Sequence, residues 1–256
     1  MTQAKLHDSG KYSFSNCNFS NLEIVGHGAA IVCTSSHSTI NIVSCSFTSC
    51  TSSLNGGAVF SDGKWNSLTV ADCLFKDCLT TSTTSYPGGG GICVEGSSAS
   101  LTIHTTSFIE CKASVTNRGG SGFFASQMHS SYTYSSRFIS CLTNCAGGAI
   151  FFYEVSNAIS ISDTLFSDNS AASHGGAIRE HSNTIPSTPH ISYSFFTGNT
   201  AQNKHGNDFC VYPEITSTPF TLSLSTGDSN RVAWATGDQA HVYEDEDIWL
   251  PQGIVT

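Results

Sequence analysis

Short segments in which apolar and polar residues alternate recur along most of the chain. Alternation with a period of two is typical of a β-strand that buries one face and exposes the other. No stretch shows the 3.6-residue period of an amphipathic helix, so the pattern predicts an all-β protein. The alternating segments are Tyr12–Phe14, Ile40–Ile42, Leu68–Val70, Leu101–Ile103, Tyr132–Tyr134, Ile159–Ile161 and Ile191–Tyr193.

A phenylalanine follows each of these segments, and these phenylalanines recur about every thirty residues. Phe is among the most often buried residue types, so one Phe at a fixed point of each unit predicts an aromatic stack in the core. Three positions further on, at what we call the ladder position, most units carry Cys or Asn. The phenylalanines are Phe19, Phe47, Phe75, Phe108, Phe138, Phe166 and Phe196, and the ladder residues are Cys50, Cys78, Cys111, Cys141, Asn169 and Asn199.

A pair of glycines precedes a third short apolar segment in most units. Gly adopts positive φ and allows two backbone segments to approach closely, so we expect the pair to form a tight corner. A phosphate-binding loop is not indicated, because no pair opens a helix or is followed by Gly-Lys-Ser/Thr. The clearest pairs are Gly56–Gly57, Gly147–Gly148 and Gly175–Gly176, and we assign Gly90–Gly91 and Gly119–Gly120 to the same corner.

A unit of about thirty residues with three short strands cannot bury its apolar side chains alone. If each unit winds once around an axis, every strand pairs in parallel with its counterpart roughly 4.8 Å away in the next unit. The repeat therefore predicts a single right-handed parallel β-helix, a solenoid of about seven to eight three-stranded coils. A β-sandwich or propeller is the less favoured alternative, since a propeller blade needs four strands in roughly 40 residues.

The repeats occupy residues 12–212. Residues 1–11 form an N-terminal lead-in without the apolar segment of a signal peptide, and residues 213–256 form an irregular closing segment or an eighth coil. The longest insertions, Leu79–Pro87 and Lys112–Arg118, predict variable loops on one side of the solenoid. We expect the chain to be a piece of a longer surface protein.

Composition narrows the classes of function. Lys and Arg number 10 against 19 Asp and Glu, for a formal charge of −9, so no basic surface for nucleic acid is expected. Ser and Thr make up 69 of the 256 residues, which predicts a hydroxyl-rich surface. The best apolar run, Ala146–Tyr153, is far shorter than the roughly 20 residues of a membrane-spanning helix.

The 11 cysteines follow the repeat and show no metal-binding spacing. Cys17, Cys45 and Cys73 each lie two residues before a Phe and should stack in the first three coils. Neighbouring coils place Cα atoms at a separation that a disulfide tolerates. Two states therefore remain open, reduced packed thiols and inter-coil disulfides. We predict no metal and no cofactor.

Candidate catalytic residues concentrate in one unit, at Asp163, Asp168, Arg179 and His181, with Glu180 between the last two. Hydrolysis or elimination of a polysaccharide needs carboxylates or a basic residue gathered on one face. The members of this group fall on different segments of their coil, and we expect no coil-to-coil stack of carboxylates. The prediction is therefore that the chain has no catalytic site, and these four residues serve only the alternative hypothesis.

Two motifs resemble a known family. Phe-x-x-Asn at Phe166–Asn169 and Phe196–Asn199, with Gly-Gly-Ala-Ile/Val at Gly56–Val59, Gly147–Ile150 and Gly175–Ile178, is similar to the repeats of polymorphic outer membrane proteins. The resemblance covers roughly residues 12–212. It implies a right-handed parallel β-helix of the pectin-lyase-like superfamily and a surface-exposed, adhesin-like role. It transfers no catalytic residue.

The expected function is a non-enzymatic, adhesin-like module at the cell surface or secreted, which contacts glycans or proteins of host cells or matrix. A polysaccharide lyase or hydrolase of the pectin-lyase-like fold is the alternative.

Overall fold

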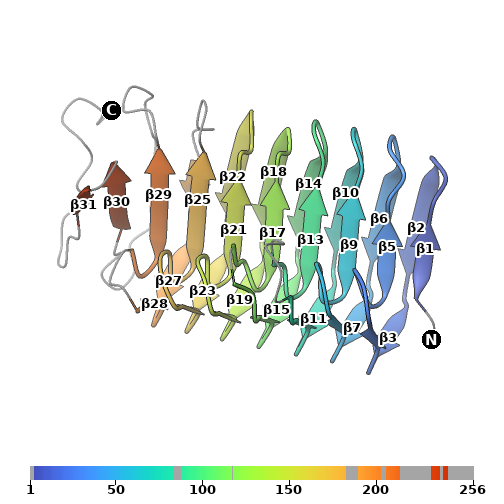
Figure 1. Ribbon diagram of the computed structural model, residues 1–256, viewed down its shortest axis with the longest axis horizontal. Coiled ribbons are helices and arrows are strands. Elements are labelled where there is room, and N and C mark those ends of the chain that lie inside the picture. Colours follow the sequence, from blue (N-terminus) through green and yellow to red (C-terminus); the bar gives the residue numbers. More distant parts are fainter. Residues whose placement is uncertain are drawn as a thin grey trace.

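The computed structural model describes residues 3–82, 88–116, 118–182, 190–202, 206–213, 232–236 and 239–241. Its strands form four sheets, here called A to D, and the chain visits them in turn before the next coil begins. Equivalent strands of successive coils lie side by side along the long axis (Figure 1). The predicted all-β solenoid is confirmed.

Each sheet gathers the equivalent strand of every coil, and all pairs are parallel except β30 with β31. Sheet A contains β1 (Ala4–Leu6), β5 (Ile31–Cys33), β9 (Val59–Asp62), β13 (Ile92–Glu95), β17 (Phe123–Ser126), β21 (Ile150–Tyr153), β25 (Ile178–Ser182), β29 (Phe209–Pro213), β30 (Val232–Thr236) and β31 (Gln239–His241). Sheet B contains β2 (Lys11–Ser15), β6 (Thr39–Val43), β10 (Ser67–Ala71), β14 (Ser100–His104), β18 (Ser130–Tyr134), β22 (Ala158–Ser162) and β26 (His190–Ser192). Sheet C contains β3 (Asn18–Ser20), β7 (Ser46–Thr48), β11 (Leu74–Lys76), β15 (Ser107–Ile109), β19 (Arg137–Ile139), β23 (Leu165–Ser167) and β27 (Phe195–Thr197). Sheet D contains β4 (Glu23–Ile24), β8 (Thr51–Ser52), β12 (Leu79–Thr80), β16 (Lys112–Ala113), β20 (Leu142–Thr143), β24 (Ser170–Ala171) and β28 (Thr200–Ala201).

Each coil has four strands where the alternation predicted three. The additional strand belongs to sheet D and directly follows the ladder position. Two residues are too few to show alternation, so the pattern gave no sign of it. β12 and β16 also take the first two residues of the predicted loops 79–87 and 112–118. The insertions therefore begin only after Thr80 and Ala113.

The coil turns where single residues adopt positive φ. Asn and Asp tolerate this left-handed conformation better than most residues, and Gly adopts it freely. Between sheets B and C these residues are Asn16, Ser44, Asp72, Thr105, Ser135, Asp163 and Tyr193. Between sheets C and D they are Asn21, Ser49, Asp77, Glu110, Ser140, Asp168 and Gly198. Between sheets D and A they are Gly28, Gly56, Gly89, Gly120, Gly147, Gly175 and Gly206.

The two glycines of a corner pair have different roles. The first has positive φ, +69° at Gly147, and makes the turn. The second, Gly148, packs against the next coil, where a Cβ would lie 1.8 Å from the carbonyl oxygen of Gly176. Gly56 with Gly57 and Gly175 with Gly176 repeat this arrangement.

Two predicted pairs were wrong by one residue. The positive-φ glycine is Gly89 in coil three and Gly120 in coil four, so the corners are Gly89–Gly90 and Gly120–Ser121. Both units contain more glycines than the corner needs, as in the run Gly88–Gly91. The sequence alone therefore left the register of these two coils ambiguous.

The Phe residues of sheet C form one continuous stack through the solenoid. Successive rings are parallel within 10°, and their centroids lie 4.5 to 5.1 Å apart. Their register is fixed by strand pairing, for example Phe75 with Phe108. All seven rings are buried. Aromatic pairs of this kind add about 0.5–1.5 kcal/mol each beyond the area they bury.

The ladder residues satisfy backbone groups beside this stack. The Cys141 thiol donates to the carbonyl oxygen of Phe108 at 3.7 Å, and Asn169 Nδ2 donates to that of Phe138 at 3.0 Å. Cys50, Cys78 and Cys111 make the equivalent contact at 3.4 to 3.6 Å. Cys and Asn thus serve as the same buried donor.

Cys17, Cys45 and Cys73 begin a second ladder that Thr and Ser continue in later coils. The Cys45 backbone N–H donates to Cys73 Sγ, and the Cys73 N–H donates to Thr106 Oγ1, each at 3.3 Å. All 11 cysteines are free thiols in the structure. Of the two states left open by the sequence, the structure has the reduced one.

Candidate functional site

The alternative catalytic group does not assemble. Asp163 is the corner residue between β22 and β23, and Asp168 is the corner residue between β23 and β24. Arg179 and His181 lie on β25, in sheet A. The two aspartates occupy corner positions of positive φ that the other coils fill mostly with Asn, Asp or Ser, and the left-handed backbone there suits Asn and Asp. Their recurrence is explained by backbone geometry.

Arg179, Glu180 and His181 are consecutive on β25, so Glu180 faces the side opposite to the other two, and each has different surroundings. Arg179 Nη1 donates to Cys210 Sγ of the next coil at 2.6 Å, and only 6% of Arg179 is exposed. His181 stacks on Tyr153 with ring centroids 5.3 Å apart. Glu180 is fully buried among the core side chains, and desolvation raises its pKa to about 8. These contacts do not converge on one reacting centre.

A different set of polar residues lines up on the outer face of sheet A. Strand register places Asp62 beside Glu95, Glu95 beside Ser126, and Ser126 beside Tyr153. His181 continues the row one coil further. Each residue is the fourth of its strand, so the alternation of the strand directs every one of them to the same side. We call these five residues the sheet A row.

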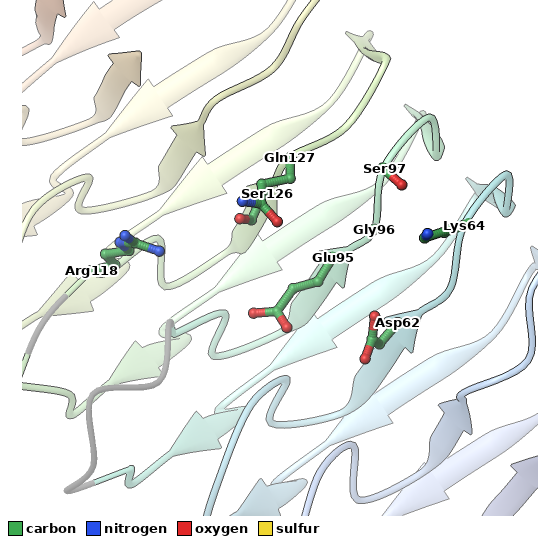
Figure 2. Close-up of a pocket in the computed structure, with 8 residues that line it drawn as sticks. All are labelled: Asp62, Lys64, Glu95, Gly96, Ser97, Arg118, Ser126 and Gln127. Atoms are coloured by element: carbon green, nitrogen blue, oxygen red, sulfur yellow. The ribbon is translucent and has the colours of Figure 1, made fainter. Parts of the chain in front are cut away.

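One end of the sheet A row borders a hollow of about 390 Å³. Figure 2 shows Asp62 and Glu95 projecting from neighbouring strands, with Glu95 between Asp62 and Arg118 in this view. All of the lining side chains are polar or charged, apart from one glycine. The lining residues are Asp62, Lys64, Glu95, Gly96, Ser97, Arg118, Ser126 and Gln127.

Glu95 is the most perturbed group of the hollow. Its pKa is raised to about 7, because desolvation and then the nearby Asp62 carboxylate disfavour the ionised form more than Cys93 and Arg118 favour it. Its Oε1 accepts a hydrogen bond from Asn55 Nδ2 at 3.3 Å. Since this pKa is near neutrality, Glu95 exchanges its proton in the physiological range.

Arg118 is held in place by an aromatic ring. Its guanidinium carbon lies 3.5 Å from the centroid of the Tyr153 ring, a cation–π contact. Arg118 belongs to the predicted variable loop 112–118, so that loop contributes directly to the hollow. Gln127 Nε2 donates to Glu154 Oε2 at 3.3 Å on the adjacent rim.

The expectation that no carboxylates stack from coil to coil was wrong, because Asp62 and Glu95 are register partners. The error follows from the glycine run of coil three. Aligning Gly57 with Gly91 places Asp62 opposite Gly96, whereas the true partner of Gly57 is Gly90. A slip of one residue exchanges the two faces of a strand, so the pair was hidden. Counting back from the next alternating segments would have found the pair, because Leu68 pairs with Leu101 and Asp62 and Glu95 each lie six residues earlier.

From the sequence, Trp65, Tyr86, Tyr153 and Trp234 are also candidates for ligand contacts, and their surroundings differ. Trp65 is 62% exposed at the corner between β9 and β10, whereas Tyr153 is half-buried under Arg118. Tyr86 and the side chain of Trp234 lie outside the described residues. Sheet B presents a further hydroxyl-rich outer face, on which His104 stacks on Tyr134 with centroids 5.0 Å apart.

Metal-binding and membrane-spanning features are absent from the part of the chain that the structure describes. There, no three or more His, Cys, Asp or Glu side chains are grouped as metal ligands. Within the same ranges, no helix has the length and apolar character needed to cross a bilayer.

The fold and its repeats define a parallel β-helix protein. Residues 163–179 match the Chlamydia polymorphic membrane protein repeat. This segment contains both motifs of coil six, Phe166–Asn169 and Gly175–Ile178, so the resemblance noted from the sequence is confirmed for that coil. No curated protein and no solved structure matches the chain.

Proposed function

We propose that this chain is a surface-displayed solenoid module that binds glycans non-covalently in the hollow of sheet A. The observation that carries the proposal is the hollow itself, whose lining combines a carboxylate pair, hydroxyls, an amide and two cations. Carboxylate and amide groups accept and donate hydrogen bonds to sugar hydroxyls, and fixed polar groups give such a site its specificity. The repeat match supports display at a cell surface, because the matched repeat belongs to a membrane protein family.

The rigid strands beneath the hollow also suit a binding function. The floor of the site is a strand ladder locked to its neighbours, so its polar groups are held in place before a ligand arrives. Preorganised groups lose little conformational entropy on binding. The Arg118 segment adds a variable rim, where substitutions change specificity without disturbing the core.

Occlusion of the hollow tests the proposal. Ser97 is an exposed lining residue, so Ser97→Trp should fill the hollow without touching the core. We expect this variant to lose binding to a panel of immobilised glycans and to cultured cells. Ser13→Trp places the same side chain on the exposed face of sheet B and is the matched control. Equal binding by both variants and the wild type would contradict the proposal.

Glycoside hydrolysis is a second candidate, favoured by the Asp62–Glu95 pair. Paired carboxyl groups with separated proton affinities are the basis of acid–base cleavage of glycosides. A protonated Glu95 would give its proton to the glycosidic oxygen as the C–O bond breaks, while Asp62 takes a proton from the water that adds to the sugar carbon. Release of new reducing ends by the wild type, and none by Glu95→Gln, would establish this reaction. No release from any bound glycan would exclude it for this site.

A further inference from the structure

Arg118 is a strong hydrogen-bond donor that lines the hollow. It makes no ion pair within the ranges that the structure describes, and it stacks on the Tyr153 ring, an arrangement in which the N–H donors lie in the guanidinium plane and not against the ring. The edge of that plane matches the paired oxygens of a carboxylate or sulfate group. Building on the glycan-binding function above, we propose that the hollow binds the anionic group of an acidic glycan through Arg118, and that protonation of Glu95 strengthens this binding.

The charges of the lining explain the second part of the proposal. With Glu95 ionised, two carboxylates balance the cations Lys64 and Arg118. With Glu95 protonated, the cations exceed the single remaining carboxylate of Asp62, and an incoming anion meets a net positive site. Charges in a partly desolvated site interact more strongly than in bulk water, so this one proton has a measurable effect.

The groups that face Glu95 come from four places. Asp62 is on β9, Cys93 is on the same strand as Glu95, Asn55 precedes β9, and Arg118 precedes β17. Asp62 disfavours the ionised form of Glu95, and Arg118 favours it. An anion on Arg118 would neutralise the favourable partner, so binding and proton uptake at Glu95 should support each other.

Asn55 can accommodate both protonation states of Glu95. It is 1% exposed, and its Oδ1 has no hydrogen-bond partner, while its Nδ2 donates to ionised Glu95. Rotating the amide by half a turn exchanges the two atoms, so that Oδ1 accepts a hydrogen bond from the O–H of the protonated carboxyl group. The buried Oδ1 of Asn55, which otherwise has no hydrogen-bond partner, thereby gains one when Glu95 is protonated.

The experiment compares matched pairs of oligosaccharides by calorimetry. A glucuronate oligomer is compared with its carboxyl-reduced form, and a sulfated oligomer with its desulfated form. We expect the anionic member of at least one pair to bind, with an affinity about tenfold higher at pH 6 than at pH 8, because only the protonated fraction of Glu95 is competent. The two pairs distinguish carboxylate from sulfate as the preferred group.

Variants separate the two parts of the proposal. Glu95→Gln mimics the protonated state, so it should bind at pH 8 as tightly as the wild type does at pH 6 and lose the pH dependence. Arg118→Gln should lose at least about tenfold in affinity at both pH values. Glu110→Gln and Arg137→Gln make the same changes at exposed residues elsewhere and are the controls. Far-ultraviolet circular dichroism verifies the fold of each variant.

The outcomes are distinct. Unchanged pH dependence in Glu95→Gln overturns the role of Glu95. Equal binding of the anionic and neutral members of both pairs overturns the anionic ligand, yet leaves the proposed glycan-binding function standing. If the wild type binds none of the four oligomers and no member of the glycan panel, both proposals are overturned.

Discussion

The backbone N–H of Cys141 donates to Oδ1 of Asn169 across one coil, at 3.0 Å. Asn169 also donates through Nδ2 to Phe138 and to Asn199, so its side chain joins three coils. Cys141 reaches the Phe108 carbonyl oxygen in the same way by a longer bond to sulfur. The ladder position therefore requires a small buried donor, and Asn fulfils the requirement more completely than Cys.

Removing that side chain should weaken the fold measurably. Asn169→Ala leaves the Cys141 N–H and the Phe138 carbonyl group buried without this partner, and each such group costs about 1–3 kcal/mol. We expect the free energy of unfolding to fall by about 2–5 kcal/mol in urea denaturation. Asn169→Cys is the matched variant, because it recreates the thiol of the earlier coils. A loss as large for Cys as for Ala would show that the donor has no role.

The second glycine of a corner pair should tolerate no side chain. Gly148→Ala would place a Cβ 1.8 Å from the Gly176 carbonyl oxygen, a backbone atom that cannot move without shifting a coil. We expect a loss of more than about 2 kcal/mol, because overpacking of this kind displaces backbone. Gly10→Ala makes the same change where the nearest atom, in Tyr12, is 3.5 Å away. Thermal unfolding should place the Gly10 variant near the wild type, and a similar stability of both variants would contradict the explanation.

The solenoid was predictable because its physical causes repeat in the sequence. A Phe every coil, a small donor three residues later and an alternating strand before it each recur at one point of the winding. The sheet D strand was not predictable, since two residues carry no period. Its position directly after each ladder residue, as in Thr51–Ser52 after Cys50, became visible only from strand pairing.

The candidate site was harder to predict for a different reason. A solenoid site is made by side chains in register on neighbouring coils, so it depends on the alignment of units to the exact residue. The extra glycines of coil three made the alignment of Asp62 with Glu95 ambiguous by one residue. The acidic residues that stood out instead, Asp163 and Asp168, recur because corners favour them. These two aspartates are therefore explained by the positive φ of the corners and not by a catalytic site.

Thiol reactivity should follow burial along the ladders. Burial raises the pKa of the Cys93 and Cys111 thiols well above its ordinary value, which suppresses the reactive thiolate. Only Cys17 and Cys145 are half-exposed. We therefore expect a maleimide to label these two in the native protein and all 11 after denaturation, as read by peptide mass analysis. Prompt native labelling of Cys111 would contradict the buried ladder.

Glu180 should make the stability of the protein depend on pH. Its carboxyl oxygens are buried without a hydrogen-bond partner, and its pKa rises from 4.5 to about 8 on folding. Between these values the folded state binds a proton that the unfolded state has released, so stability is highest below pH 4.5 and falls as the pH rises toward 8.

Glu180→Gln isolates this contribution, because an amide has no titrating proton. The unfolding free energy of the variant minus that of the wild type should increase by up to about 1.4 kcal/mol for each pH unit in this interval and level off above it. Glu23→Gln, at an exposed position of β4, makes the same substitution and should leave the pH profile unchanged. Denaturant titrations at four pH values give the comparison. A constant difference between the Glu180 variant and the wild type would mean that this carboxyl group titrates as it does in the unfolded chain.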